Sequence, residues 1–142
     1  MSSPILLVIS SKTGNTRTFV DFFKEHCSRE VIVCEDYSAS LKDYDKIAFG
    51  CYTWGNGKIP KQLKEFLIKN HHLLKDKEVF IFGSGNSIYP RFCGAVDGVS
   101  KICSDSGAKI VGTFKFEQRF NTLNFDKEEI DNLIEIIKEW SA

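Results

Sequence analysis

The sequence alternates short, almost continuously apolar runs with segments in which apolar residues recur at helical spacing. The apolar runs with strand composition are Ile5–Ile9, Val31–Cys34, Ile47–Cys51, Val79–Phe82 and Ile110–Phe116. A strand that is apolar at nearly every position must be covered on both faces, which predicts a parallel sheet between two layers of helices. We therefore expect a doubly wound α/β fold with five parallel strands in the order 2-1-3-4-5.

Four helices are predicted to cover this sheet. The first begins after Asn15, the second near Pro60, the third spans about residues 94–106, and the fourth opens at Asp126. Glu129 stands three residues after Asp126, which is the spacing of a capping box. Each segment has an apolar stripe on one side, so each helix is expected to bury one face against the sheet.

The chain has no linker, repeat or low-complexity segment, so residues 1–142 are predicted to form one domain. Its five cysteines are an odd number without C-x-x-C spacing, which argues against disulfides or a zinc site and favours a cytoplasmic location. Nineteen basic residues balance nineteen acidic ones, whereas nucleic-acid binding normally needs a basic excess. No apolar stretch approaches the ~18 residues of a membrane span. We expect neither nucleic acid nor membrane nor metal as a partner.

Ligands of such sheets bind beyond the carboxyl ends of the strands, at the switch in strand order. Three loops are expected there: S-K-T-G-N-T at residues 11–16, G-C-Y-T-W-G-N-G at 50–57, and G-S-G-N-S-I-Y-P-R-F-C at 83–93. The first opens a helix and can direct backbone N–H groups at an anion. The other two carry Trp54 and Tyr89, which are suited to covering a flat heterocycle. Each loop alone could be an N-cap cluster or an ordinary connection, but together they predict a phosphate cradle with two aromatic covers.

These three motifs, with G-A-V-D directly after the third, resemble the phosphate loop and the two flavin-flanking loops of short-chain flavodoxins. The similarity extends over essentially the whole chain. It implies a flavodoxin-like fold, non-covalently bound FMN and a low-potential one-electron carrier between redox enzymes, not an enzyme with catalytic residues of its own. The implied partners are a flavodoxin reductase and an acceptor enzyme, and the implied state is a monomer.

The resemblance gives each motif residue an expected role. The residues expected to hold the FMN phosphate are Ser11, Lys12, Thr13, Gly14, Asn15 and Thr16. Those expected along the phosphate, the ribityl chain and one flavin face are Tyr52, Thr53, Trp54, Gly55, Asn56 and Gly57. Those expected at the other face, the pyrimidine edge and its rim are Ser84, Gly85, Asn86, Tyr89, Phe92 and Cys93.

The chain departs from typical flavodoxins in its charge, because the family is strongly acidic and this chain is neutral. Asn56 and Asn86 stand where the family often has aspartate, and Lys12, Lys58 and Arg91 add positive charge near the expected site. Nearby cations favour an anion, so we expect the reduced flavin to form more easily than in acidic relatives. Electrostatic steering of partners is expected to be weaker.

An alternative is the flavodoxin-like activator of manganese-dependent class Ib ribonucleotide reductase, of the NrdI type. It also binds FMN, and its partner is the metal subunit of the reductase. The neutral charge and the stretches Lys58-Ile59-Pro60 and Lys115-Phe116-Glu117 resemble this activator. The intact pair Trp54 and Tyr89, followed by G-A-V-D, resembles the electron-carrying flavodoxins instead.

Overall fold

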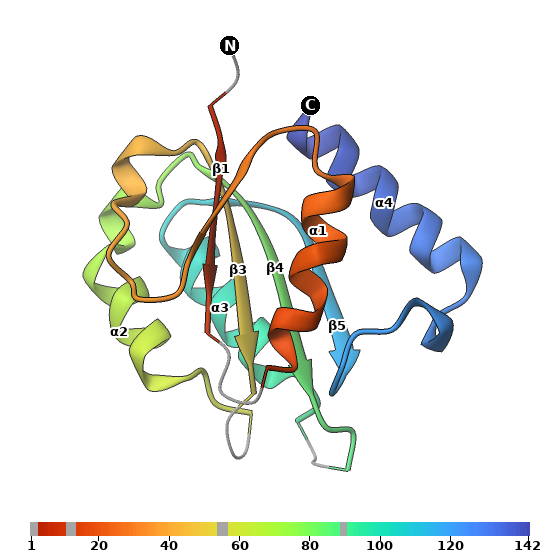
Figure 1. The fold of residues 1–142 in the computed structure, drawn as a ribbon. Coiled ribbons are helices and arrows are strands. Elements are labelled where there is room, and N and C mark those ends of the chain that lie inside the picture. The colour runs from red at the N-terminus through yellow and green to blue at the C-terminus, as the bar shows by residue number, and fades with distance from the viewer. Residues whose placement is uncertain (1–2, 11–13, 54–56, 89–90) are drawn as a thin grey trace.

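The computed structural model describes residues 3–10, 14–53, 57–88 and 91–142. Its strands are β1 (Ile5–Ile9), β2 (Val31–Cys34), β3 (Lys46–Tyr52), β4 (Glu78–Gly85) and β5 (Lys109–Glu117). They form one parallel sheet in the order β2-β1-β3-β4-β5, which confirms the predicted topology. Because every pair is parallel, all carboxyl ends lie at one edge of the sheet, at the bottom of Figure 1.

Helices cover both faces of the sheet. The α-helices are α1 (Val20–His26), α2 (Lys61–Lys69), α3 (Gly94–Asp105) and α4 (Lys127–Ser141), and the short 3-10 helices are η1 (Thr16–Phe19), η2 (Leu41–Asp43), η3 (His71–Leu73) and η4 (Thr122–Asn124). Helices α1 and α4 pack on one face, and α2 and α3 pack on the other (Figure 1). The predicted capping box of α4 is confirmed, with Asp126 and Glu129 each bonded to the backbone of the other. No helix within the described ranges is long and apolar enough to cross a membrane.

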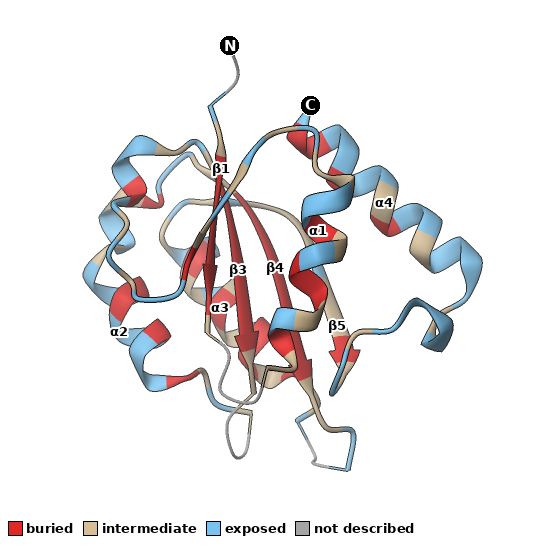
Figure 2. Cartoon of the chain, viewed as in Figure 1, coloured by how far each residue is buried: buried red, intermediate tan, exposed pale blue. Residues whose placement is uncertain are grey.

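The central strands are buried on both faces, as Figure 2 shows in red. Alternate residues of β1 enter the two cores, Leu6 and Val8 towards α2 and α3, and Leu7 towards α1 and α4. In the second core Phe19 is fully buried, with its ring centroid 4.5 Å from that of Phe82. Burying a phenylalanine contributes roughly 1.5–3 kcal/mol. This contact anchors η1, and with it the start of the helix that follows the predicted phosphate loop.

Strand β4 continues further than the sequence predicts. The apolar run ends at Phe82, but the strand extends to Gly85 because residues 83–85 pair with residues 115–117 of β5. Ser84 and Gly85, which were expected in a loop, therefore lie at the end of β4, where pairing with β5 fixes their backbone. Backbone pairing with a neighbour can continue a strand through small residues that carry no hydrophobic pattern of their own.

Candidate functional site

The described part of the first loop ends at the start of η1, which has no side-chain cap from Asn15. Gly14 has φ +86°, and a Cβ built on it would meet no atom within 4 Å. Asn15 precedes η1 without making a side-chain capping hydrogen bond, and η1 runs directly into α1. The first N–H groups of a helix have no partner within it, and they attract anions. The geometry of Gly14 and Asn15 thus fits the phosphate expected at this loop.

A buried hydrogen bond joins the first loop to β4. The hydroxyl oxygens of Thr16 and Ser84 lie 3.0 Å apart, and both residues are almost completely buried. The backbone carbonyl of Ser84 accepts a hydrogen bond of 3.1 Å from the N–H of Thr53, directly after β3. Ser84 therefore connects the three segments that carry the predicted binding motifs.

The second loop is held against the start of α3. The Thr53 hydroxyl accepts a hydrogen bond of 3.3 Å from the N–H of Ala95. Gly57 has φ +82°, and a Cβ on it would lie 2.7 Å from Cβ of Arg91. A Cβ on Gly94 would lie 2.8 Å from Cα of Gly57. The backbones of the second and third loops approach so closely here that only glycine fits.

Cys93 has a structural position at this junction. Its φ is +51°, and its thiol donates towards the carbonyl oxygens of Gly83 at 3.7 Å and Phe116 at 3.6 Å. A Cβ on Gly85 would lie 2.8 Å from the Cys93 sulfur. Burial raises the pKa of the Cys93 thiol to about 11, so the group stays protonated and packs as a small core residue.

The third loop is braced by an acid that the sequence analysis missed. Glu117, at the end of β5, accepts hydrogen bonds from the Ser87 N–H at 3.1 and 3.0 Å. The Asn86 side chain accepts a bond of 3.1 Å from the N–H of Ile88, whose side chain is 78% exposed. Nothing in the sequence around Glu117 signals this contact, because it depends on the pairing of β4 with β5.

The described ranges include eleven of the eighteen predicted flavin ligands. The structure brings together, at the carboxyl edge of the sheet, Gly14, Asn15, Thr16, Tyr52, Thr53, Gly57, Ser84, Gly85, Asn86, Phe92 and Cys93. The predictions for Ser11, Lys12, Thr13, Trp54, Gly55, Asn56 and Tyr89 lie outside the described residues. The roles of all these residues towards FMN stay predictions.

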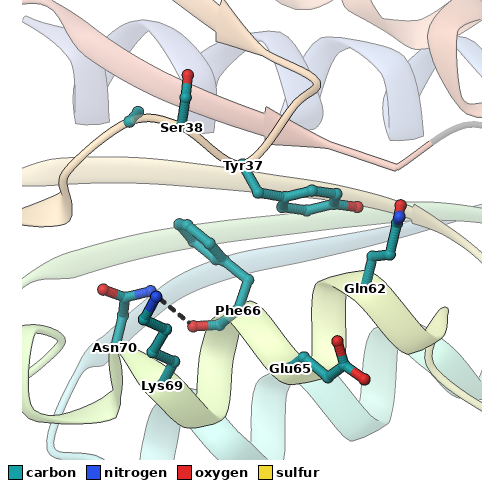
Figure 3. Close-up of a pocket in the computed structure, with 8 residues that line it drawn as sticks. Tyr37, Ser38, Gln62, Glu65, Phe66, Lys69 and Asn70 are labelled. Atoms are coloured by element: carbon teal, nitrogen blue, oxygen red, sulfur yellow. Dashed lines mark hydrogen bonds between the residues drawn. The ribbon is translucent and has the colours of Figure 1, made fainter.

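A groove of about 400 Å³ lies beside this edge, between the segment after β2 and α2 (Figure 3). Its centre is the pair Tyr37 and Phe66, whose rings lie 5.5 Å apart at 47°. Burial raises the pKa of the Tyr37 hydroxyl. The Tyr37 backbone is in the left-handed region, with φ +59°. The groove is lined by Tyr37, Ser38, Ala39, Gln62, Glu65, Phe66, Lys69 and Asn70, none of them a predicted ligand. The lining residues belong to the segment after β2 and to α2 with its C-cap, and not to the three loops that carry the motifs.

Comparison with protein families matches residues 7–140 to the family described as Flavodoxin. The chain belongs to the flavodoxin family. A flavodoxin of Maridesulfovibrio salexigens is 38% identical over 121 residues, which cover 78% of this chain and 82% of that protein. The protein NrdI of Bacillus licheniformis is 28% identical over 133 residues, covering 92% and 90% of the two chains.

Solved flavodoxin structures share the fold. The oxidised flavodoxin 1 of Bacillus cereus superposes with a TM-score of 0.78 at 26% identity, covering 97% of each chain. A Fusobacterium nucleatum flavodoxin bound to flavin mononucleotide has a TM-score of 0.68 at 19% identity, covering 97% of this flavodoxin and 94% of that chain. The doubly wound sheet, the strand order and the family predicted from the motifs are all confirmed.

Proposed function

We propose that this flavodoxin carries electrons one at a time between redox proteins on a non-covalently bound FMN. The observation that carries the proposal is the junction at the carboxyl edge of the sheet. There Ser84 bonds to Thr16 and Thr53, and Gly57 packs against Arg91 and Gly94. Three loops with phosphate-binding and flavin-covering motifs are thus tied to one another by buried or closely packed contacts.

The described residues divide the work of binding. The N–H groups after Gly14 would hold the phosphate, since Asn15 makes no side-chain capping bond at the start of η1. The backbone of Gly85 and Asn86 would hold the pyrimidine edge, and Thr53 would hold the ribityl chain. Bound FMN supplies the redox chemistry, and the chain contributes position, exclusion of water and electrostatic tuning. No residue of the chain needs to give or take a proton for the carrier function.

Binding is tested first, with purified apoprotein titrated with FMN and followed by quenching of flavin fluorescence. We expect one FMN per chain, and weaker binding of riboflavin, which lacks the phosphate. Riboflavin serves as the control for the first loop, because the two ligands share the flavin ring and the ribityl chain. Failure to bind FMN would contradict the proposal.

Carrier function is tested by anaerobic reductive titration of the holoprotein. Two well-separated one-electron steps are expected, because a carrier that works in single electrons must hold the half-reduced state. Overlapping steps would favour the activator of class Ib ribonucleotide reductase. That alternative is the weaker one, since the NrdI relative shares 28% identity and the Maridesulfovibrio flavodoxin 38%.

The partners in this proposal are a reductase that loads the flavin and an enzyme that accepts the electron, with the chain acting as a cytoplasmic monomer. Five free cysteines support a reducing compartment. Size-exclusion chromatography of the holoprotein tests the monomer, and elution at twice the expected mass would contradict it.

A further inference from the structure

A row of exposed cations begins just before α2 and continues along its first turns. Lys58, Lys61 and Lys64 are spaced three residues apart, and all three are exposed. Arg91 is exposed as well, and its side-chain carbons lie against Gly57, directly before Lys58. We call Lys58, Lys61, Lys64 and Arg91 the basic strip. Along the chain it runs from the junction of the second and third loops, where Arg91 lies against Gly57, onto the first turns of α2.

Neighbouring acids do not neutralise the basic strip. On α3, Asp97 pairs with Lys115 at 2.9 Å and Asp105 pairs with Lys101 at 3.2 Å. Glu65 of α2 lines the groove of Figure 3. No salt bridge within the described ranges includes a member of the strip, and the residues outside those ranges contain no aspartate or glutamate. Within the described residues, the four cations of the strip are therefore left without an ion-pair partner, although the whole chain is neutral.

Helix stability does not explain these cations. The positive end of a helix dipole favours acids in the first turn and disfavours lysine there. The other three α-helices follow this preference, with Asp21 in α1, Asp97 in α3 and two glutamates in α4. Helix α2 has no acid in its first turn and begins with Lys61. Because a lysine in the first turn destabilises α2, its positive charge points to a contact with another molecule.

The position of the strip suits electron transfer. Gly57 and Arg91 belong to the two loops expected to flank the flavin, and they touch each other. Ile59, directly after Lys58, packs against Gly98 of α3, where an added Cβ would lie 2.9 Å from the Ile59 side chain. This contact holds the start of the strip on α3. A protein bound to the strip would therefore lie beside the predicted flavin edge.

We propose that the basic strip is a docking surface for a redox partner protein whose surface around its own prosthetic group is acidic. The proposal rests on the carrier function argued above. In the docked complex one electron leaves the reduced flavin and reduces the partner's metal or flavin by one electron, and no bond of either protein forms or breaks. Opposite potentials raise the encounter rate and orient the two proteins.

The test uses the FMN-loaded protein, reduced beforehand with dithionite in the absence of oxygen, and two acceptor proteins of opposite charge. Plastocyanin is an acidic copper protein and cytochrome c is a basic haem protein, and both accept a single electron. The strip variant combines Lys58→Gln, Lys61→Gln and Lys64→Gln, and it leaves Arg91 packed on Gly57. The control variant combines Lys24→Gln, Lys127→Gln and Lys138→Gln, which are exposed positions on α1 and α4. Both variants change the net charge equally.

We expect stopped-flow mixing to show that the wild type reduces plastocyanin faster at low salt than at high salt. The strip variant should lose roughly tenfold in this rate at low salt, the control variant should not, and the strip variant should reduce cytochrome c no more slowly than the wild type. Its melting temperature should not fall, because the dipole of α2 gains from the loss of lysine.

Several results would overturn the docking surface. One is a plastocyanin rate that does not depend on salt in the wild type, which needs no variant to measure. Another is an equal loss in the strip and control variants, which would reflect net charge alone. A strip variant that loses only affinity for a DNA oligonucleotide, with both acceptor rates unchanged, also contradicts a protein partner. If electrons reach neither acceptor, the carrier function itself fails, and the docking surface with it.

Discussion

The hydroxyl groups of Thr16 and Ser84 lie 3.0 Å apart, although 68 residues separate them in the sequence. Both residues are buried, so neither hydroxyl can exchange its partner for water. The bond fixes the first residue of η1 to the end of β4. It thereby couples the helix start expected to hold phosphate to the strand end expected to face the pyrimidine edge.

Replacement of Ser84 by alanine should weaken both folding and FMN binding. Ser84→Ala leaves the buried Thr16 hydroxyl unpaired, which costs about 1–3 kcal/mol in the free energy of unfolding. Urea unfolding measures this loss, and FMN titration measures the change in affinity. Ser100→Ala is the matched control, since the Ser100 hydroxyl donates to the Val96 carbonyl one turn earlier in the same helix, α3. The double variant Thr16→Val with Ser84→Ala should recover part of the loss, and additive losses would contradict the coupling.

Two glycines of α3 should respond differently to the same substitution. Gly94→Ala places a methyl group 2.8 Å from the backbone of Gly57, which cannot move without shifting the second loop. Gly98→Ala meets only the flexible side chain of Ile59 at 2.9 Å, and alanine is favoured by up to about 1 kcal/mol in a helix. FMN affinity should therefore fall in Gly94→Ala and stay close to wild type in Gly98→Ala. Equal affinities in the two variants would contradict the close approach.

Thiol reactivity should separate Cys27 from the buried cysteines. Cys51, Cys93 and Cys103 are fully buried, and burial raises the pKa of Cys103 to about 12 and that of Cys93 to about 11. Only a thiolate reacts with a disulfide reagent, so these thiols should be slow at about pH 8. In the native protein the partly exposed Cys27 should react first, and Cys27→Ser should remove this phase. After unfolding, all five thiols should react, and five fast thiols in the native state would contradict the structure.

The ion pair of Lys46 and Glu78 should make stability depend on acidity. The two side chains lie 2.6 Å apart, and the hydrogen bond from Lys46 lowers the pKa of Glu78 below its usual 4.5. A lowered pKa in the folded state contributes stability above the unfolded value, and this stability is lost as the pH falls through the folded value. The pair is partly exposed, so Glu78→Gln should cost less than about 1 kcal/mol at neutral pH.

Urea unfolding at about pH 7 and about pH 3 measures this dependence. The difference between the wild type and Glu78→Gln should shrink at the lower pH, because the stability contributed by the charged glutamate is lost as the pH falls towards its lowered pKa. Glu139→Gln, at an exposed position of α4, is the control and should show no such convergence. A constant difference between the wild type and Glu78→Gln at both pH values would contradict the pKa argument.

Local patterns in the sequence were sufficient to predict the strands, the α-helices and the family. The apolar runs predicted all five strands, and parallel pairing followed from the nearly continuous apolar character of these runs. The Asp126 and Glu129 spacing predicted the start of α4, because a capping box joins residues of a single helical turn. The three motifs predicted where a phosphate and a flat ring would bind, because parallel strands end at one edge of the sheet.

The contacts that join the loops were decided by tertiary structure alone. The bond between Thr16 and Ser84, the approach of Gly57 to Arg91 and the brace from Glu117 each connect segments far apart in the chain. Such contacts depend on strand register and on how helices pack, which neighbouring residues do not encode. The sequence by itself therefore determined the sheet and its helices, and it predicted the edge at which a ligand is expected to bind. Only the tertiary structure decided which side chains stabilise that edge, and which of the charged residues form ion pairs. The reason is that distant segments must pack together before their charges and hydroxyls can meet.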